Sequence, residues 1–245
     1  MFPYLPSPPK LVFEDKKKNL GVFEIEGLYR GYGITLGNAL RRVLLSSLEG
    51  AAITKVKIKN VAHEFSTIEG VMEDVIEIIL NLKKLRFKMF SEGPETLKLK
   101  ASGIKEVKGK DIEKNPNVEI VNPDQLIARL TSKKAKLEME MTVEKGLGYV
   151  PVEQQKKGKV PIGTILVDAL FSPIKKVSFE VEEMRVGERT DFNRLKLAIE
   201  TDGTISPQEA LKKASEILVE HFQILSGKEL EKEAKTTKEK KAKKE

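Results

Sequence analysis

Apolar residues cover nearly the whole circumference of one short segment of this chain. Residues 31–47 read GYGITLGNALRRVLLSS and predict a helix with Thr35 as its N-cap. The apolar positions are Leu36, Ala39, Leu40, Val43, Leu44 and Leu45. The polar remainder is Asn38, Arg41, Arg42 and Ser46. Because an ordinary surface helix carries a single apolar stripe, this one needs cover on two sides. The pattern favours a subunit of an assembly.

A second helix is predicted near the C-terminus, where Ser206 precedes Pro207 and Glu209 completes a capping box. Gly227 is expected to end it. One apolar row has the alternating spacing of a helix-pairing seam and comprises Leu211, Ala214, Leu218, His221 and Leu225. A second row beside it comprises Ala210, Ile217 and Ile224. Two apolar rows again indicate two neighbours.

Alternating apolar and polar residues predict strands elsewhere. The strand candidates are residues 20–28, 52–60, 97–101, 118–121, 137–143, 177–182 and 195–199. Residues 187–193 are expected to connect the last two strands as a hairpin. A further helix is predicted after the capping-box sequence at 66–69, with an apolar face running from Val71 to Leu82.

These patterns predict an α+β fold with two domains. Residues 10–49 and 171–228 are expected to form a dimerisation domain of antiparallel strands with two packed helices. A β-rich insert, residues 50–170, interrupts it. The last segment, 229–245, is expected to be a disordered basic tail, since it has no apolar residue larger than alanine.

Composition narrows the class of protein. The 245 residues are 40% hydrophobic, enough for one large or two modest cores. The chain has no cysteine, which excludes disulfides and thiolate metal sites. No signal peptide or bilayer-spanning run is expected, so the predicted location is cytoplasmic. The net charge is +7, of which residues 231–245 hold +3 because they contain seven lysines and four glutamates.

Candidate chemistry is sparse. The glycines at 31, 33 and 37 allow a phosphate-binding interpretation, but their spacing departs from G-x-G-x-x-G, and close helix packing is favoured. His63 near Ser66 allows a catalytic pair, although no motif supplies an orienting carboxylate. An acidic group could bind a divalent cation or simply face water; it comprises Glu73, Asp74 and Glu77. We expect no catalytic residue, metal site or cofactor on this chain.

Two arginines on the apolar helix are stronger candidates for partner contacts. Arg41 and Arg42 point about 100° apart, so they can serve different surfaces. Each guanidinium either reaches water or binds partner carboxylates and carbonyls. We expect at least one of them to contact a partner.

Several blocks of this sequence together resemble the bacterial RNA polymerase alpha subunit family, between about Leu20 and Leu225. The first is the apolar helix, residues 31–47. The others are HEFST at 63–67 with EGV at 69–71, EIILNLK at 77–83, GLGYVP at 146–151, LVDA at 166–169 with SP at 172–173, RTD at 189–191 and TDGTI at 201–205.

The resemblance implies a non-catalytic subunit of a nucleotidyltransferase complex. It implies a homodimer that scaffolds the assembly of the beta and beta-prime subunits, with catalysis in beta-prime. The implied dimer contacts are Leu36, Leu40, Val43, Leu44, Leu211, Ala214, Leu218, His221 and Leu225. The implied contacts with the large subunits are Arg41, Arg42, Leu45, Tyr149, Arg189 and Asp191, of which Arg42 matches the family's beta-contacting arginine.

Family members usually continue into a small DNA-binding domain, whereas this sequence ends in a lysine-rich segment. Either a truncation of the chain or a natural short form of the protein would explain this difference. DNA contact is expected only through the holoenzyme or weakly through the tail, and no membrane partner is expected. The alternative classes are a nucleic-acid-binding structural protein, suggested by the lysines at 55, 57 and 59, and a small-molecule enzyme, for which no convergent polar pocket is evident.

Overall fold

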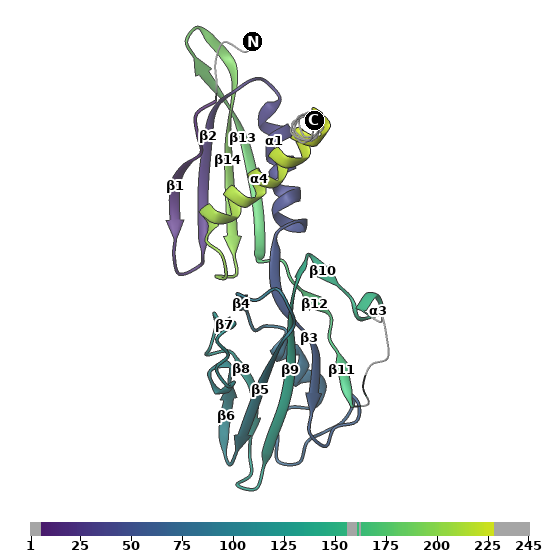
Figure 1. Ribbon diagram of the computed structural model, residues 1–245. Coiled ribbons are helices and arrows are strands. Elements are labelled where there is room, and N and C mark those ends of the chain that lie inside the picture. Colours follow the sequence, from purple (N-terminus) through teal and green to yellow (C-terminus); the bar gives the residue numbers. More distant parts are fainter. Residues whose placement is uncertain (1–5, 156–160, 162, 228–245) are drawn as a thin grey trace, which may run out of the picture. The chain divides into compact units, whose positions relative to one another are not determined.

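The computed structural model describes residues 6–155, 161 and 163–227 (Figure 1). It is an α+β protein built mostly of antiparallel strands, as expected from the sequence. The chain divides into two compact units. The first contains Met1–Leu45, Lys176–Glu200 and Ser206–Glu245, and the second contains Ser46–Lys175 and Thr201–Ile205. Residues 46–49, 171–175 and 201–205, which the sequence patterns assigned to the first domain, thus lie in the second unit. The expected tail at 229–245 lies outside the described residues.

The first unit has a four-stranded antiparallel sheet in the order β1-β2-β14-β13. Its strands are β1 (Lys10–Asp15), β2 (Leu20–Leu28), β13 (Ile174–Val186) and β14 (Arg189–Thr201). The predicted strand at 20–28 is confirmed residue for residue. The hairpin connection is shorter than predicted, because both strands extend until only Gly187 and Glu188 separate them, with Gly187 at φ +63°.

Two helices, α1 (Tyr32–Ser46) and α4 (Pro207–Leu225), pack on the same face of this sheet. Leu36 of α1 packs against Ile25 and Leu195 in the core. A Cβ on Gly21, which shares the sheet face of Ile25, would lie 2.8 Å from Pro207 Cβ at the start of α4. The buried face of the sheet is therefore shared between the two helices (Figure 1).

The second unit is built on a six-stranded sheet in the order β5-β9-β3-β4-β7, with β11 also paired to β3. Its strands are β3 (Glu49–Ile58), β4 (Phe87–Met89), β5 (Glu95–Ser102), β7 (Val118–Ile120), β9 (Lys136–Leu147) and β11 (Thr164–Leu166). Two two-stranded sheets accompany it: β6 (Lys105–Lys108) with β8 (Leu126–Leu130), and β10 (Tyr149–Val150) with β12 (Ala169–Leu170). The short helical elements are η1 (Gly109–Asp111), α2 (Val75–Leu82) and α3 (Val152–Gln155).

The predicted helix that begins after residues 66–69 starts later than expected. Its first residue is Val75, and its N-cap is Asp74, whose carboxylate accepts a hydrogen bond of 2.7 Å from Glu77 N. Earlier residues are engaged elsewhere, because Val71 forms a bridge with Leu130 of β8 and Met72 N donates to Arg129 O. Pairing with a strand therefore prevents the helix from starting earlier. The prediction from the capping box was wrong.

Candidate protein-protein interface

Glycines determine how α1 enters and lies on the sheet. Gly31 has φ +86°, and its amide donates a 2.8 Å hydrogen bond to Asn193 Oδ1. A Cβ on Gly33 would meet Val181 Cγ1 at 2.7 Å, and one on Gly37 would meet Phe179 Cδ2 at 2.6 Å. The helix backbone therefore lies against β13 too closely for any side chain. This geometry supports close packing as the reason for the glycines.

Thr35 is not the N-cap of this helix. α1 begins three residues earlier, at Tyr32, directly after the left-handed turn at Gly31. Thr35 lies within the first turn, and its Oγ1 donates back to Gly31 O at 3.3 Å. The turn at Gly31 replaces the side-chain cap that the sequence suggested.

The apolar residues of α1 divide into inner and outer groups. Leu40 and Leu44 are buried within the chain itself, and Leu36 and Val43 are half-buried. Ile34 is 57% exposed, and Leu45 is 39% exposed. Because Leu40 and Leu44 belong to the core of a single chain, any partner surface on α1 must rest on the outer residues.

The second helix is formed as its end signals predicted. Ser206 Oγ accepts from Glu209 N at 3.2 Å, and Glu209 Oε2 accepts from Ser206 N at 3.2 Å, so the capping box is complete. α4 ends at Leu225, two residues before Gly227 at φ +74°. These predictions from the sequence are confirmed.

The side chains of the apolar seam of α4 become more exposed toward the end of the helix. Leu211 and Ala214 are buried in the chain's own core, and Leu218 is half-buried. Leu225 is 81% exposed, and His221 is also exposed, with its Nδ1 2.8 Å from Ile217 O of the same helix. Only the second half of the seam is available to another molecule.

Sequence reasoning missed part of this exposed surface. Phe222, 61% exposed, is absent from both predicted rows, and Val219 is exposed as well. Leu218, Phe222 and Leu225 follow one another at intervals of four and three residues, so they form a continuous stripe on a helix. That spacing was a usable signal. The predicted row joined Leu218 to Leu225 through His221, and it therefore passed over Phe222, the next residue.

The two arginines of α1 occupy different environments. Arg41 is half-buried, with its Nη2 3.5 Å from Asn38 Oδ1. Arg42 is exposed and lies three residues before Leu45, on the same face of the helix. Arg42 and Leu45 thus form an accessible pair that combines a guanidinium with an apolar side chain.

In the first unit, the hairpin of β13 and β14 carries two further candidate contacts. Arg189 Nε and Nη2 donate to the two oxygens of Asp191 at 3.0 and 2.8 Å. This bidentate hydrogen bonding lowers the pKa of the Asp191 carboxyl and raises the pKa of Arg189. The Arg189 guanidinium also lies 5.1 Å from the centre of the Phe192 ring. The pair is therefore held in one orientation at the surface.

In the second unit, Tyr149 is exposed on β10 beside an anchored loop. Asp168 holds this loop, because its Oδ1 accepts from Val152 N at 3.1 Å and its Oδ2 lies 3.0 Å from Lys83 Nζ. Gln155 Nε2 donates to both Val150 O and Val167 O. The predicted contact residue Tyr149 thus lies on a segment with defined conformation.

The candidate chemical groups lie in the second unit. Ser66 Oγ lies 3.3 Å from His63 Nδ1 at an exposed position. Glu73 is buried, and its Oε2 accepts from Arg129 N at 2.6 Å. Within residues 6–155, 161 and 163–227, no group of three or more histidine, cysteine or acidic side chains is arranged to hold a metal ion. None of the helices in this described part combines the length and apolar character required to cross a membrane.

Comparison with known proteins gives a consistent family. Residues 56–172 match the family described as RNA polymerase Rpb3/RpoA insert domain. The chain is 52% identical over 216 residues to the DNA-directed RNA polymerase subunit alpha of Carboxydothermus hydrogenoformans, covering 88% of this chain and 69% of that protein. It is 50% identical over 220 residues to the protein of the same name from Rubrobacter xylanophilus, covering 90% and 70%. The corresponding protein of Moorella thermoacetica is 51% identical over 219 residues.

Proposed function

We propose a function from one premise: the chain belongs to the family of DNA-directed RNA polymerase alpha subunits. It is accordingly a subunit of DNA-directed RNA polymerase, a nucleotidyltransferase complex. Within that complex its proposed role is non-catalytic. Two copies associate through α1 and α4, and the dimer then recruits the beta and beta-prime subunits.

The exposed apolar residues on the second half of α4 carry this proposal. Phe222, Ile224 and Leu225 are all more than half exposed on a helix whose first half is firmly packed. Burying one such side chain contributes about 1.5–3 kcal/mol, so leaving several in water is costly. A second copy would offer the same surface in return, as a two-fold symmetric interface requires. A specific dimer would bury more than about 1,000 Å² in total.

The test is the oligomeric state of the chain carrying Phe222→Asp and Leu225→Asp together. Size-exclusion chromatography with light scattering should report dimers for the unchanged chain and monomers for this variant at micromolar concentration. Phe90→Asp is the matched control, because Phe90 is 59% exposed but lies in the second unit; it should remain dimeric. A dimeric double variant, or a monomeric unchanged chain, would overturn the proposal. Leu40→Asp is unsuitable, since burial of Leu40 makes unfolding the expected result.

Recruitment of the beta subunit is proposed to use Arg42 and Leu45. Both side chains are exposed on one face of α1, and an arginine fork suits partner carboxylates and carbonyls. Arg42→Ala should leave the dimer intact and abolish co-purification with beta. Arg41→Ala is the comparison variant: because its guanidinium is half-buried beside Asn38, it should weaken co-purification less than Arg42→Ala does. Normal co-purification of the Arg42 variant would refute this contact.

A further inference from the structure

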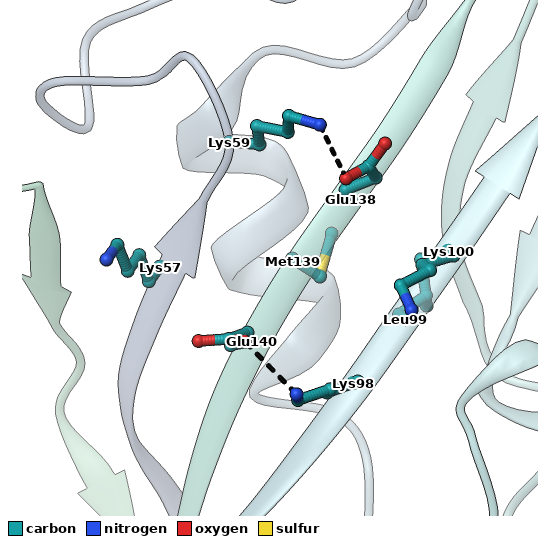
Figure 2. Close-up of a pocket in the computed structure, with 8 residues that line it drawn as sticks. All are labelled: Lys57, Lys59, Lys98, Leu99, Lys100, Glu138, Met139 and Glu140. Atoms are coloured by element: carbon teal, nitrogen blue, oxygen red, sulfur yellow. Dashed lines mark hydrogen bonds and ion pairs between the residues drawn. The ribbon is translucent and has the colours of Figure 1, made fainter.

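Lysines gather on one face of the six-stranded sheet in the second unit. Lys57 projects from β3 and Lys59 from the turn that directly follows it, and Lys98 and Lys100 project from β5 (Figure 2). They line a hollow of about 260 Å³. β9 crosses between them and contributes two glutamates. Four lysines and two glutamates line this hollow, and Glu113 lies 3.3 Å from Lys100 Nζ, so the group carries one lysine more than its carboxylates.

The strand register arranges these charges in two rows. Glu140 on β9 lies opposite Lys57 on β3 and opposite Lys98 on β5 in the strand register. Glu138 stands opposite Lys100 on β5, and on its other side it lies 2.9 Å from Lys59 Nζ. Each row therefore has two lysines and one glutamate.

The glutamates neutralise only part of this charge. Lys59 pairs with Glu138, Lys98 pairs with Glu140 at 3.6 Å, and Lys100 pairs with Glu113 at 3.3 Å. Lys57 is exposed and makes no ion pair with any residue that the structure describes. The pKa of the Glu138 carboxyl is lowered, first by the hydrogen bond from Lys59 and further by the charges of Lys59, Lys100 and Lys136. Positive potential thus remains over this part of the sheet.

We infer that this lysine face binds an acidic protein segment in an extended conformation. Lys57 lies near the end of β3 and Lys59 directly follows that strand, and two residues of extended chain span about 6.8 Å. Carboxylates two residues apart on an extended peptide have the same separation. The two glutamates can accept hydrogen bonds from the peptide's amides or pair with its basic residues.

The chemistry of the hollow favours a peptide over nucleic acid. Single-stranded nucleic acid is held by bases stacked on aromatic rings, and none of the eight lining residues is aromatic. Glu138 and Glu140 would also face a continuous phosphate backbone with like charge. A protein segment can alternate its charges to match both rows.

The experiment measures binding of a labelled ten-residue peptide of alternating glutamate and serine to the full chain at low salt. Lys57→Glu should weaken binding about fivefold or more, because a favourable charge becomes a repulsive one at a site whose side chain holds no other group. Lys17→Glu is the matched control; it changes the net charge equally at an exposed turn of the first unit and should alter binding less than twofold. Binding should also fall as salt rises.

A second variant distinguishes loss of the Lys57 charge from its reversal, and a second ligand tests the choice of occupant. Lys57→Gln removes the charge without reversing it and should weaken binding by about twofold to threefold, with circular dichroism confirming an unchanged fold. Equal weakening by the Lys57 and Lys17 variants would mean diffuse attraction and would overturn the site. Tighter binding of a single-stranded DNA decamer than of the peptide would overturn the choice of occupant.

Discussion

Lys83 at the end of α2 and Asp168 between β11 and β12 form an ion pair of 3.0 Å across 85 residues of sequence. The same carboxylate accepts a hydrogen bond from Val152 N through its other oxygen. One side chain therefore joins the C-terminal end of a helix to the loop that follows Tyr149. These hydrogen bonds, that from Lys83 above all, lower the pKa of Asp168 below its ordinary value of 3.8.

Asp168→Asn should destabilise the second unit by at most about 1 kcal/mol at pH 7, because both side chains of the pair are about one-third exposed and water screens them. A carboxyl with a lowered pKa in the folded state contributes stability above its unfolded pKa and loses it as the pH falls through the folded value. Urea unfolding should therefore separate the two proteins at pH 7 and give stabilities that converge as the pH falls through the folded pKa of Asp168. A difference that persists in acid would contradict the assignment to this ionised carboxylate.

Gly37→Ala should destabilise the first unit by about 1–3 kcal/mol despite alanine's better helix propensity, which favours it by about 1 kcal/mol. The added Cβ would lie 2.6 Å from Phe179 Cδ2, so either the ring or the helix must move. Gly93→Ala is the control: its Cβ would have no neighbour within 4 Å, and its effect should stay within about 0.5 kcal/mol. Thermal unfolding measures both, and equal effects would argue against close packing of α1.

Ser206→Ala should cost about 1 kcal/mol, since it leaves Glu209 N without its side-chain acceptor at the start of α4. Gln208→Ala, at an exposed position in the same turn, should change the free energy of unfolding by only a few tenths of a kcal/mol. Chemical denaturation followed by circular dichroism distinguishes them. If the two variants were equally stable, the capping box would contribute nothing measurable.

Local signals predicted a large part of the fold. The caps of α4 and the strand at 20–28 depend on neighbouring residues, and the structure has them as expected. Where a distant strand intervened, the prediction failed: Val71 and Met72 pair with β8, so α2 starts at Val75 instead of following the earlier capping box. β1 carried no recognised pattern. Its edge position beside β2 is visible only in the sheet.

For the candidate interface, the sequence determined which helices are apolar, how α4 begins and ends, and which family the chain resembles. Only the tertiary structure decided which of those apolar residues the chain buries itself. Leu40 and Leu211 are in the core, whereas Phe222 and Leu225 face outward. Periodicity places residues on the same side of a helix, but what covers that side depends on strands distant in sequence. Burial, which sets the cost of exposure to water, is therefore a property of the folded chain.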